Sequence, residues 1–391
     1  MVESHSTVSS SNIPFTTYVV KVASRCNLNC SYCYMYNLQD KTYRGQPPRM
    51  SDEVTKALGA AMRRHSEEHD LEGVHVILHG GEPLLIGKDA LVSWVHQIRR
   101  AFDSSPTRVL FSIQSNGTLV DEEWVSLLDS LDVRIGLSVD GPRKHHDRFR
   151  VTHAGKGSFD DTLSAIRMMR SSEAGRRVFS TVMAVVNPEI SPQELFDFWQ
   201  DIDVPGFDLC MPHANRVHPP DFPISDYGDW LIEFFDLWFR QNRPDRHIRY
   251  FDNMIRMLFE YPISTDNIGG RPVGVIVVET NGELELTDAF KCCAEGMTKS
   301  GLNVTKNEFS ELHSIPMVRD LQVGAQSLCE QCQNCSAFRV CGGGYMPHRY
   351  GPDGTFRYPS IYCEALYRLA HHMRERVHSS MPTELREELT K

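Results

Sequence analysis

The sequence has no long uninterrupted run of apolar residues. A helix that spans a bilayer needs about 20 consecutive apolar residues, and no stretch of the 391 residues approaches that length. The first 13 residues are polar and rich in serine, without the basic start and apolar centre of a secretory signal. We therefore expect no membrane partner and a cytoplasmic location.

The chain also lacks an excess of positive charge. It has 41 lysine and arginine residues against 51 aspartate and glutamate residues, which gives a formal net charge of −10 with histidine neutral. Domains that bind nucleic acid usually carry a basic face, so we expect no nucleic-acid partner. The hydrophobic content of 41% is ordinary for a globular enzyme with a sizeable core.

Cysteine, by contrast, is abundant, with 11 residues. In a chain without a secretion signal, this number favours metal ligation over disulfides. Cys26, Cys30 and Cys33 lie together with the spacing C-x3-C-x2-C. A [4Fe–4S] cluster normally takes four cysteine ligands, so three ligands leave one iron open. The loop therefore indicates a cluster that binds a substrate or cofactor and takes part in catalysis.

Zinc and disulfides are the alternatives for this loop. Structural zinc is usually closed by four ligands, and the first histidine after the loop, His65, is far along the chain. Three cysteines also leave one thiol unpaired in any disulfide scheme. The spacing, and the aromatic residues Tyr32 and Tyr34 on either side of Cys33, favour the cluster.

Short apolar runs alternate with amphipathic stretches through the first half of the chain. We predict six strands, at 18–23, 74–78, 109–114, 133–139, 178–186 and 207–211. We predict helices at 51–65, 89–102, 121–130, 158–171 and 192–200. Strands that alternate with helices imply a parallel sheet, and six such units predict an α/β fold with an open, partial (β/α)6 barrel similar to a TIM barrel.

Glycine and polar residues directly follow three of these strands. H-G-G-E-P follows the strand at 74–78, S-N-G-T the strand at 109–114, and D-G-P the strand at 133–139. In parallel α/β folds, ligands bind at this edge of the sheet. Glycine lets a backbone approach a ligand, and a carboxylate can pair with an ammonium group. Ordinary turns are the alternative for each motif.

A second group of cysteines lies near the C-terminus, at Cys329, Cys332, Cys335, Cys341 and Cys363. Paired cysteines are common in zinc sites, so zinc is again an alternative to a cluster. The segment 216–268 is rich in aromatic and leucine residues at helical spacing and reads as a helical linker. Asn281-Gly282, between runs at 273–280 and 283–287, predicts a β-hairpin.

These motifs resemble those of the radical S-adenosylmethionine (SAM) enzymes with a C-terminal SPASM domain, roughly over residues 15–375. C-x3-C-x2-C is the signature of that family, and G-G-E-P matches its second motif. The resemblance implies that the open iron binds SAM and that an electron from an external donor cleaves it to a 5′-deoxyadenosyl radical, which abstracts a hydrogen from the substrate. The cofactor contacts implied are Tyr32 (adenine), Gly80, Gly81, Glu82, Ser115, Asn116, Ser138 and Asp140.

The same resemblance implies one auxiliary [4Fe–4S] cluster, held by Cys332, Cys335, Cys341 and Cys363. Family members with two auxiliary clusters continue C-x3-C from the position of Cys341, where this chain has Tyr345, and a preceding Gly-x4-Cys element is also missing. A second auxiliary cluster is therefore the less expected outcome. The roles of Cys292, Cys293 and Cys329 stay open.

The resemblance divides the chain into five parts. We expect residues 1–14 to be a disordered N-terminus, 15–215 the radical SAM partial barrel, 216–268 the linker, 269–375 the SPASM auxiliary-cluster domain, and 376–391 a charged tail. Only 25 residues precede Cys26, too few for a leader-binding domain. We therefore expect that a separate protein or another surface binds the leader of a peptide substrate.

The run C-G-G-G-Y-M-P-H-R-Y at 341–350 resembles the peptide maturases that form cyclophane crosslinks between an aromatic ring and a β-carbon. The implied substrate is a ribosomal precursor peptide, whose β-hydrogen is abstracted before the carbon radical attacks the ring. Asp140, Asp288 and His348 are candidate bases. The alternatives are thioether or ether crosslinking, epimerisation, sulfatase-type oxidation and, in another class, a non-catalytic metal-binding module.

Overall fold

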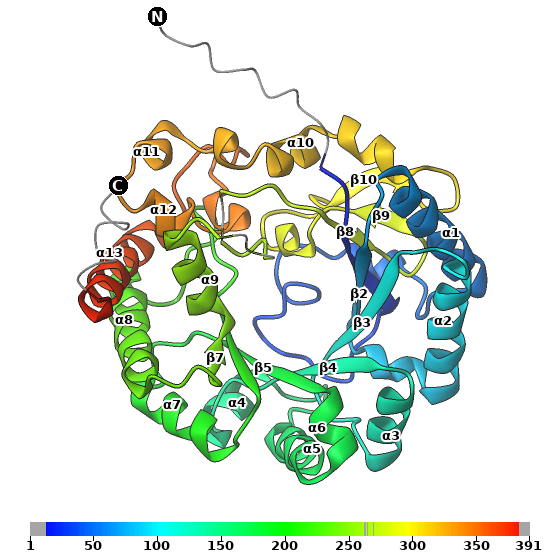
Figure 1. The fold of residues 1–391 in the computed structure, drawn as a ribbon, viewed down its shortest axis with the longest axis horizontal. Helices are drawn as coiled ribbons and strands as arrows, with labels where there is room; N and C mark the ends of the chain where they lie inside the picture. Colours follow the sequence, from blue (N-terminus) through cyan, green and yellow to red (C-terminus); the bar gives the residue numbers. More distant parts are fainter. Residues whose placement is uncertain (1–12, 262, 264, 269, 383–391) are drawn as a thin grey trace, which may run out of the picture.

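A sheet of ten strands curves around the centre of the molecule (Figure 1). The computed structural model describes residues 13–382 except 262, 264 and 269, so the N-terminus at 1–12 lies outside the described residues. The strand order is β10-β9-β8-β1-β2-β3-β4-β5-β6-β7. The six strands of the predicted barrel are parallel neighbours: β1 (Thr17–Ala23), β2 (Gly73–Gly80), β3 (Arg108–Ser115), β4 (Val133–Ser138), β5 (Phe179–Val185) and β6 (Gly206–Cys210).

Helices connect these strands and cover the outer face of the sheet (Figure 1). They are α1 (Asp52–Glu68), α2 (Lys88–Ala101), α3 (Glu122–Ser130), α4 (Arg143–Phe149), α5 (Phe159–Ser171), α6 (Glu173–Val178) and α7 (Pro192–Asp201). The predicted cap Ser51 accepts a hydrogen bond from the Val54 amide at 3.2 Å, which starts α1. The predicted partial (β/α)6 barrel is confirmed.

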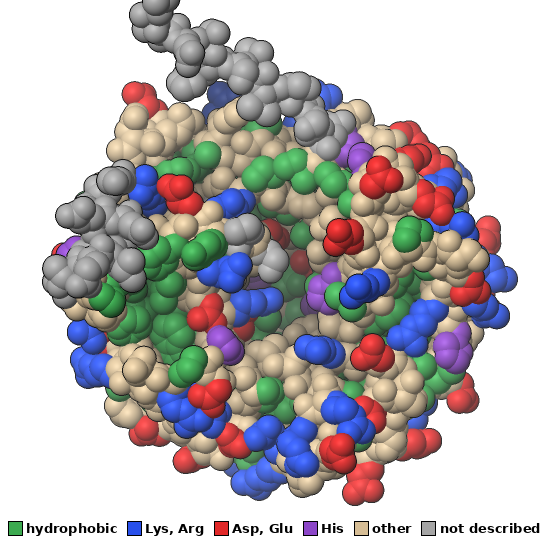
Figure 2. Space-filling model, in the orientation of Figure 1, with side chains coloured by type: hydrophobic (Ala, Val, Ile, Leu, Met, Phe, Trp, Pro, Cys, Tyr) green, Lys and Arg blue, Asp and Glu red, His purple; other side chains and the backbone are tan. Residues whose placement is uncertain are grey.

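The two faces of the barrel strands differ in burial. On β2, Val74, Val76 and Leu78 are buried, whereas the alternate residues His75 and His79 are half-buried. Since successive side chains of a strand point to opposite faces, the first set packs under the helices and the second faces the barrel lumen. Figure 2 shows a hollow at the centre of this view, with charged and histidine side chains around it.

The chain after β6 closes the open side of the barrel. Helix α8 (Ile224–Gln241), strand β7 (His247–Ile248) and helix α9 (Arg249–Leu258) occupy the segment predicted as a linker. The predicted hairpin is present as β8 (Val275–Val278) and β9 (Glu283–Glu285), followed by β10 (Lys299–Asn303). Strand β8 pairs in parallel with β1, so the cysteine-rich region extends the barrel sheet.

Short helices dominate the rest of the C-terminal region. They are α10 (Pro316–Gln322), α11 (Glu330–Gln333) and α12 (Phe338–Cys341), with 3-10 turns η3 (Asp288–Cys292), η4 (Phe309–Ser314), η5 (Gly324–Ser327) and η6 (Met346–Arg349). Two further 3-10 turns, η1 (Thr42–Gly45) and η2 (Pro83–Ile86), follow β1 and β2.

The last helix, α13 (Cys363–Ser380), lies beside α8 (Figure 1). Its residues Leu369, Met373 and Val377 are buried, so the boundary expected at 376 falls inside a packed helix. Residues 383–391 of the expected charged tail lie outside the described part.

Within the described residues, no helix combines the length and the apolar character that crossing a bilayer requires.

Candidate functional site

The three-cysteine loop follows β1 and packs on the end of β2. The Gly81 amide donates to the Ala23 carbonyl at 3.0 Å, and the Glu82 amide donates to the Arg25 carbonyl at 2.9 Å. A Cβ atom would lie 1.9 Å from the Ala23 oxygen at Gly80, and 2.2 Å from the Arg25 oxygen at Gly81. The glycine pair therefore makes room for the cysteine loop, a reason that the sequence alone did not give.

Cys26, Cys30 and Cys33 are half-buried on this loop. Burial raises the pKa of the Cys26 thiol to about 12 and that of Cys33 to about 11. Without metal these thiols stay protonated at neutral pH, and because metals bind thiolates, occupation of the site must release protons.

The spacing of the thiols distinguishes a cluster from a single ion. Two cysteine ligands of one zinc ion lie at most about 4.6 Å apart, twice the Zn–S distance. In the part of the chain that the structure describes, the one trio of metal-binding side chains with ligand atoms within 4.8 Å of one another is His65, Glu68 and His69 on α1. Among the described residues, no three cysteines come that close to one another.

Glu82 joins the ends of β2 and β3. Its buried carboxylate accepts hydrogen bonds from the Leu84 amide (3.0 Å), the Ser115 hydroxyl (2.9 Å) and the Asn116 amide (2.8 Å). Burial outweighs these bonds and raises the pKa of Glu82 to about 7. The sequence predicts Glu82 and Ser115 as cofactor contacts, and the structure brings them together at one edge of the sheet.

Asn116 connects this edge to the cysteine loop. Its side-chain amide donates to the side-chain oxygen Oδ1 of Asn27 at 2.9 Å, and the side-chain amide of Asn27 donates to the Thr118 hydroxyl at 2.7 Å. The Asn116 amide nitrogen also lies 3.9 Å from the Cys26 sulfur. Asn116, predicted to contact the cofactor, thus also orients the loop that carries the thiols.

Tyr32 and Asp140 form a second polar group beside the loop. The Tyr32 hydroxyl donates to the Asp140 carboxylate, which also accepts from the Val185 amide at 3.2 Å. Arg150, which directly follows α4, donates to the Tyr32 hydroxyl at 2.9 Å. Its guanidinium is buried, and its Nε atom has no hydrogen-bond partner. The Ser138 hydroxyl, at the end of β4, accepts a hydrogen bond from the side-chain amide of Gln114 at 2.9 Å.

Arg150 is not among the residues predicted from the sequence. It follows a helix rather than a strand, and no motif marks its position. Only the folded chain brings its charge close to Cys30. Burial raises the pKa of the Cys30 thiol, and the Arg150 charge offsets part of that rise. A charge with an unused donor beside the cysteine loop is suited to binding an anionic group of a ligand.

A buried ion pair faces the lumen between β1, β2 and η3. Lys21, which is fully buried, pairs with Asp288 and lies 2.9 Å from His79 Nδ1. The nearby cations overcome the effect of burial and hold the pKa of Asp288 well below its usual range. Burial and Lys21 together lower the pKa of His79 to about 4. The candidate base Asp288 is therefore a firmly ionised carboxylate.

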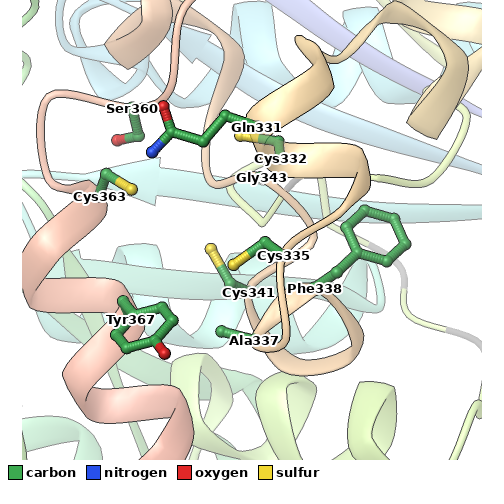
Figure 3. Close-up of a pocket in the computed structure, with 10 residues that line it drawn as sticks. All are labelled: Gln331, Cys332, Cys335, Ala337, Phe338, Cys341, Gly343, Ser360, Cys363 and Tyr367. Carbon is green, nitrogen blue, oxygen red and sulfur yellow. The ribbon is translucent and has the colours of Figure 1, made fainter.

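The C-terminal cysteines surround one cavity. Figure 3 shows its lining, which includes the four predicted ligands Cys332, Cys335, Cys341 and Cys363. Cys329 does not line this cavity, although it lies beside Cys332 and raises the pKa of that thiol.

The motif C-G-G-G-Y-M-P-H-R-Y folds under this cavity. The buried Arg349 donates to the carbonyls of Gly343 (3.0 Å) and Gly344 (2.7 Å), and so fixes the glycine turn. His348 is buried as well, and burial lowers the pKa of its imidazole to about 3. The candidate base His348 is therefore neutral at physiological pH.

Tyr345, at the position where the sequence resemblance predicts a ligand of a second auxiliary cluster, lies beside Asp266. Its hydroxyl lies 3.4 Å from an Asp266 oxygen that also accepts from the Thr287 hydroxyl at 2.8 Å. The hydroxyl groups of Tyr345 and Thr287 thus both face the Asp266 carboxylate. Asp266 is not among the residues predicted from the sequence, because nothing in the pattern of its segment distinguishes it.

Cys292 and Cys293 lie apart from the C-terminal group. Both are buried, with their sulfur atoms 3.9 Å from each other, and Cys293 contacts the Pro347 carbonyl at 3.7 Å. Cys329 contacts Cys332 instead.

Comparison with known proteins relates this geometry to a family. The family model of the Radical SAM superfamily matches residues 20–201. The cysteine-type anaerobic sulfatase-maturating enzyme of Clostridium novyi is 25% identical over 358 residues, which cover 88% of this chain and 91% of the relative. The serine-type enzyme of Bacteroides thetaiotaomicron is also 25% identical, over 86% of this chain and 84% of the relative.

Solved structures support the same fold. Native anSMEcpe with bound AdoMet and the Cp18Cys peptide superposes with a TM-score of 0.80 at 21% identity, over 93% of this chain and 98% of the other. Streptococcus suis SuiB bound to the precursor peptide SuiA gives a TM-score of 0.59 at 13% identity, over 90% of this chain and 76% of the other.

Proposed function

We propose that this chain is a radical SAM enzyme, as the match to that superfamily over residues 20–201 supports, and that it oxidises a side chain of a peptide substrate by removing a hydrogen from its β-carbon. When bound, SAM and the [4Fe–4S] cluster supply a 5′-deoxyadenosyl radical that abstracts this hydrogen atom. The observation that carries the proposal is the meeting of the three-cysteine loop and the Glu82 edge at the mouth of a lumen lined by ionisable groups.

The proposed cofactor site uses opposite charges on two sides of the loop. Cys26, Cys30 and Cys33 would hold the reducing cluster. The Glu82 carboxylate would face the ammonium group of SAM, since a carboxylate has about four acceptor positions and three are in use. The Arg150 guanidinium would pair with the SAM carboxylate through its unused donor.

The auxiliary cluster would occupy the cavity lined by Cys332, Cys335, Cys341 and Cys363. Because Cys329 does not line this cavity, Cys329→Ser should leave the iron content unchanged, whereas Cys332→Ser should lose about four of roughly eight irons per chain. Iron and sulfide analysis after anaerobic reconstitution measures this difference. Equal iron loss in both variants would assign Cys329 as a ligand.

The relatives favour oxidation of the sulfatase-maturation type. Maturating enzymes of both the cysteine type and the serine type align with more than four fifths of this chain. In this reaction a cysteine or serine side chain of the peptide becomes an aldehyde. The substrate loses one hydrogen atom from its β-carbon, one proton from its hydroxyl or thiol group and one electron, which the auxiliary cluster would accept. With cysteine the product of this step is a thioaldehyde, which becomes the aldehyde when water replaces its sulfur and hydrogen sulfide leaves.

The occupation of the second-cluster position favours another candidate, the cyclophane crosslink. Tyr345 and Thr287 direct hydroxyl groups to Asp266 there, and the surrounding motif resembles that of the crosslinking maturases. The balance of hydrogens and electrons is the same as for oxidation to an aldehyde. The difference is that the β-carbon radical first attacks an aromatic ring.

One anaerobic experiment separates these outcomes. The reconstituted enzyme, SAM and a reductant are incubated with peptides that contain a single cysteine, a single serine, or an aromatic residue two positions before an aliphatic one. Capture by a hydroxylamine reagent would identify the aldehyde. A crosslink would be identified by a peptide that has lost two hydrogens, does not react with the hydroxylamine reagent and does not fragment between the two linked residues in mass spectrometry. Absence of both 5′-deoxyadenosine and any modified peptide would refute the proposed function.

A further inference from the structure

The segment that carries the three-cysteine loop has a basic outer side. Residues 25–49 include four cationic side chains, those of Arg25, Lys41, Arg44 and Arg49. Their single acidic residue, Asp40, is fully buried and accepts hydrogen bonds from the amides of Thr42 (2.9 Å) and Gly296 (2.7 Å). The exposed charge of this segment is therefore positive, in a chain whose formal net charge is −10.

The chain after α4 adds positive charge beside the loop. It packs along the loop, since the Asn29 amide donates to the Val151 carbonyl at 2.7 Å and His153 Nε2 donates to the Cys26 carbonyl at 3.0 Å. The turn that follows His153 carries the exposed Lys156. This packing completes a basic face, which we define as Arg25, Lys41, Arg44, Arg49 and Lys156.

The cations of the basic face have no carboxylate partners. In the part of the chain that the structure describes, none of the five forms an ion pair with an acidic side chain. The arginines of the neighbouring α4 differ, because Arg143 binds Asp160 at 2.7 Å and Arg148 pairs with Glu189. Asp160 also lies near Lys156, but Arg143 already holds it. Cations without bound carboxylates contribute their full charge to the field outside the protein.

Hydrogen bonds hold the basic face in a fixed shape. The Arg25 guanidinium donates to the carbonyls of Tyr43 (3.2 Å) and Gln46 (3.3 Å), and the Lys41 ammonium donates to the Tyr36 carbonyl at 2.6 Å. These carbonyls orient the two cations without neutralising them. The half-buried Tyr43 ring packs against Tyr36 at 4.7 Å. Tyrosine and arginine are residue types that are enriched in protein–protein interfaces.

We propose that the basic face is the docking surface of a small acidic protein that carries a one-electron flavin or iron–sulfur centre. This inference rests on the proposed function, which needs one electron at the first cluster for each SAM that is cleaved. The centre of the carrier is oxidised by one electron, and the cluster held by Cys26, Cys30 and Cys33 gains that electron. Only the electron crosses the interface.

The position of the basic face favours an electron carrier over an acidic peptide. Electron transfer slows steeply with the distance between two centres, so a carrier has to dock close to the cluster. Arg25 directly precedes Cys26, and Lys156 comes three residues after His153, which binds the Cys26 carbonyl. A peptide side chain instead has to reach the lumen, whereas the cations of the basic face are exposed or half-buried at the outer surface.

The charge of the whole chain restricts where such a carrier binds. The net charge of −10 repels an acidic protein from most of the surface, whereas the basic face attracts and orients it. Exposed acidic residues follow the face at the start of α1, with Asp52 and Glu53, and so give it a boundary. Because salt screens exposed charges, the attraction should weaken as the ionic strength rises.

The test reverses two charges of the face in the double variant Arg44→Glu, Lys156→Glu. The matched control is Arg100→Glu, Arg134→Glu, which changes the net charge equally. Its residues are exposed at the end of α2 and the start of β4, and both positions lie at the sheet edge opposite to the cysteine loop.

The probe is a reduced acidic flavodoxin at limiting concentration, and the readout is 5′-deoxyadenosine formed from SAM by the reconstituted enzyme without peptide. At low ionic strength the rate should fall about tenfold or more in the Arg44→Glu, Lys156→Glu variant and should match the wild type in the control. With dithionite, a small reductant that needs no docking surface, all three proteins should react equally.

A second readout measures binding without turnover. Fluorescence anisotropy of labelled flavodoxin should show that its affinity for the wild-type enzyme falls as salt is added, and that Arg44→Glu, Lys156→Glu loses most of this salt dependence. Iron analysis checks that all proteins hold the same clusters. If the double variant loses iron, the neutral pair Arg44→Gln, Lys156→Gln replaces it and should show a smaller change in the same direction.

The outcomes separate the docking surface from the proposed function. Absence of 5′-deoxyadenosine from the wild-type enzyme with dithionite would refute the proposed function. Equal rates with flavodoxin in the two double variants, or an equal decrease with dithionite and with flavodoxin, would overturn the docking assignment. An unchanged response to flavodoxin together with a higher KM for an acidic peptide would assign the basic face to the substrate instead.

Discussion

Replacement of Glu82 by glutamine should remove a pH-dependent cost of folding. Glu82 is 1% exposed, and burial raises its pKa from 4.5 to about 7 despite three hydrogen bonds. A carboxyl group whose folded pKa exceeds its unfolded pKa binds more protons in the folded state. Stability from this group is therefore present at low pH and is lost as the pH rises from about 4.5 to about 7.

The expected magnitude follows from this shift. Each pKa unit corresponds to about 1.4 kcal/mol, so the full loss is about 3 kcal/mol, of which about 2 kcal/mol falls between roughly pH 5.5 and 8.5. Glutamine does not titrate. Any constant cost of the amide, such as its poor match to the Asn116 amide, cancels when the two pH values are compared within each protein.

The assay is urea unfolding of the cluster-free protein at both pH values under anaerobic, reducing conditions. The free energy of unfolding of Glu82→Gln relative to the wild type should increase by about 2 kcal/mol between the lower and the higher pH. Glu123→Gln, an exposed residue whose carboxylate pairs with Lys88, is the control and should show no comparable change. A difference that is independent of pH, or one of opposite sign, would refute the argument that burial dominates at Glu82.

Three further predictions concern the loop, the C-terminal region and the cofactor. Gly81→Ala should lower the iron bound by the first cluster, because its Cβ would lie 2.2 Å from a backbone oxygen of the cysteine loop; Gly45→Ala, with nothing within 4 Å, should bind iron normally. Lys291→Met should lower the free energy of unfolding by roughly 3–5 kcal/mol, because it leaves two buried carboxylates, 2.7 and 3.2 Å from the Lys291 ammonium, without a positive partner. A loss below about 1 kcal/mol in chemical unfolding would contradict a buried pair. Arg150→Gln should weaken SAM binding about tenfold, equivalent to about 1.4 kcal/mol, in anaerobic equilibrium dialysis, and unchanged affinity would exclude the proposed contact.

Much of the fold followed from local patterns. The apolar runs from 18–23 to 207–211 correspond to β1 through β6 within one or two residues. Ser51 caps α1 as predicted, and Asn281-Gly282 connects a hairpin. These features depend on neighbours in the sequence, such as the alternation of side chains, a cap hydroxyl or a turn that needs glycine. The pairing of β8 with β1 was not predicted, because no local pattern records which distant strand a hairpin edge will join.

The candidate site shows the same division. The cysteine spacing and the G-G-E-P motif are contiguous, so the sequence alone located them, and the family comparison agrees with the chemistry inferred from them. The glycine pair of this motif was visible in the sequence as well, but the reason why glycine is needed there was not. It is the backbone of the cysteine loop, and not a ligand, that occupies the space a Cβ would take at Gly80 and Gly81.

The sequence by itself determined the kind of chemistry, because ligand type and ligand spacing are written in consecutive residues. Its resemblance to the family also predicted that Tyr345 stands where a cysteine ligand is expected. The tertiary structure alone decided what the ionisable groups can do. Lys21 and Asp288 are 267 residues apart and form a buried pair, whereas Asp266 meets hydroxyl groups. Charge and burial act through space, so the protonation of a carboxylate depends on neighbours that only the folded chain brings together.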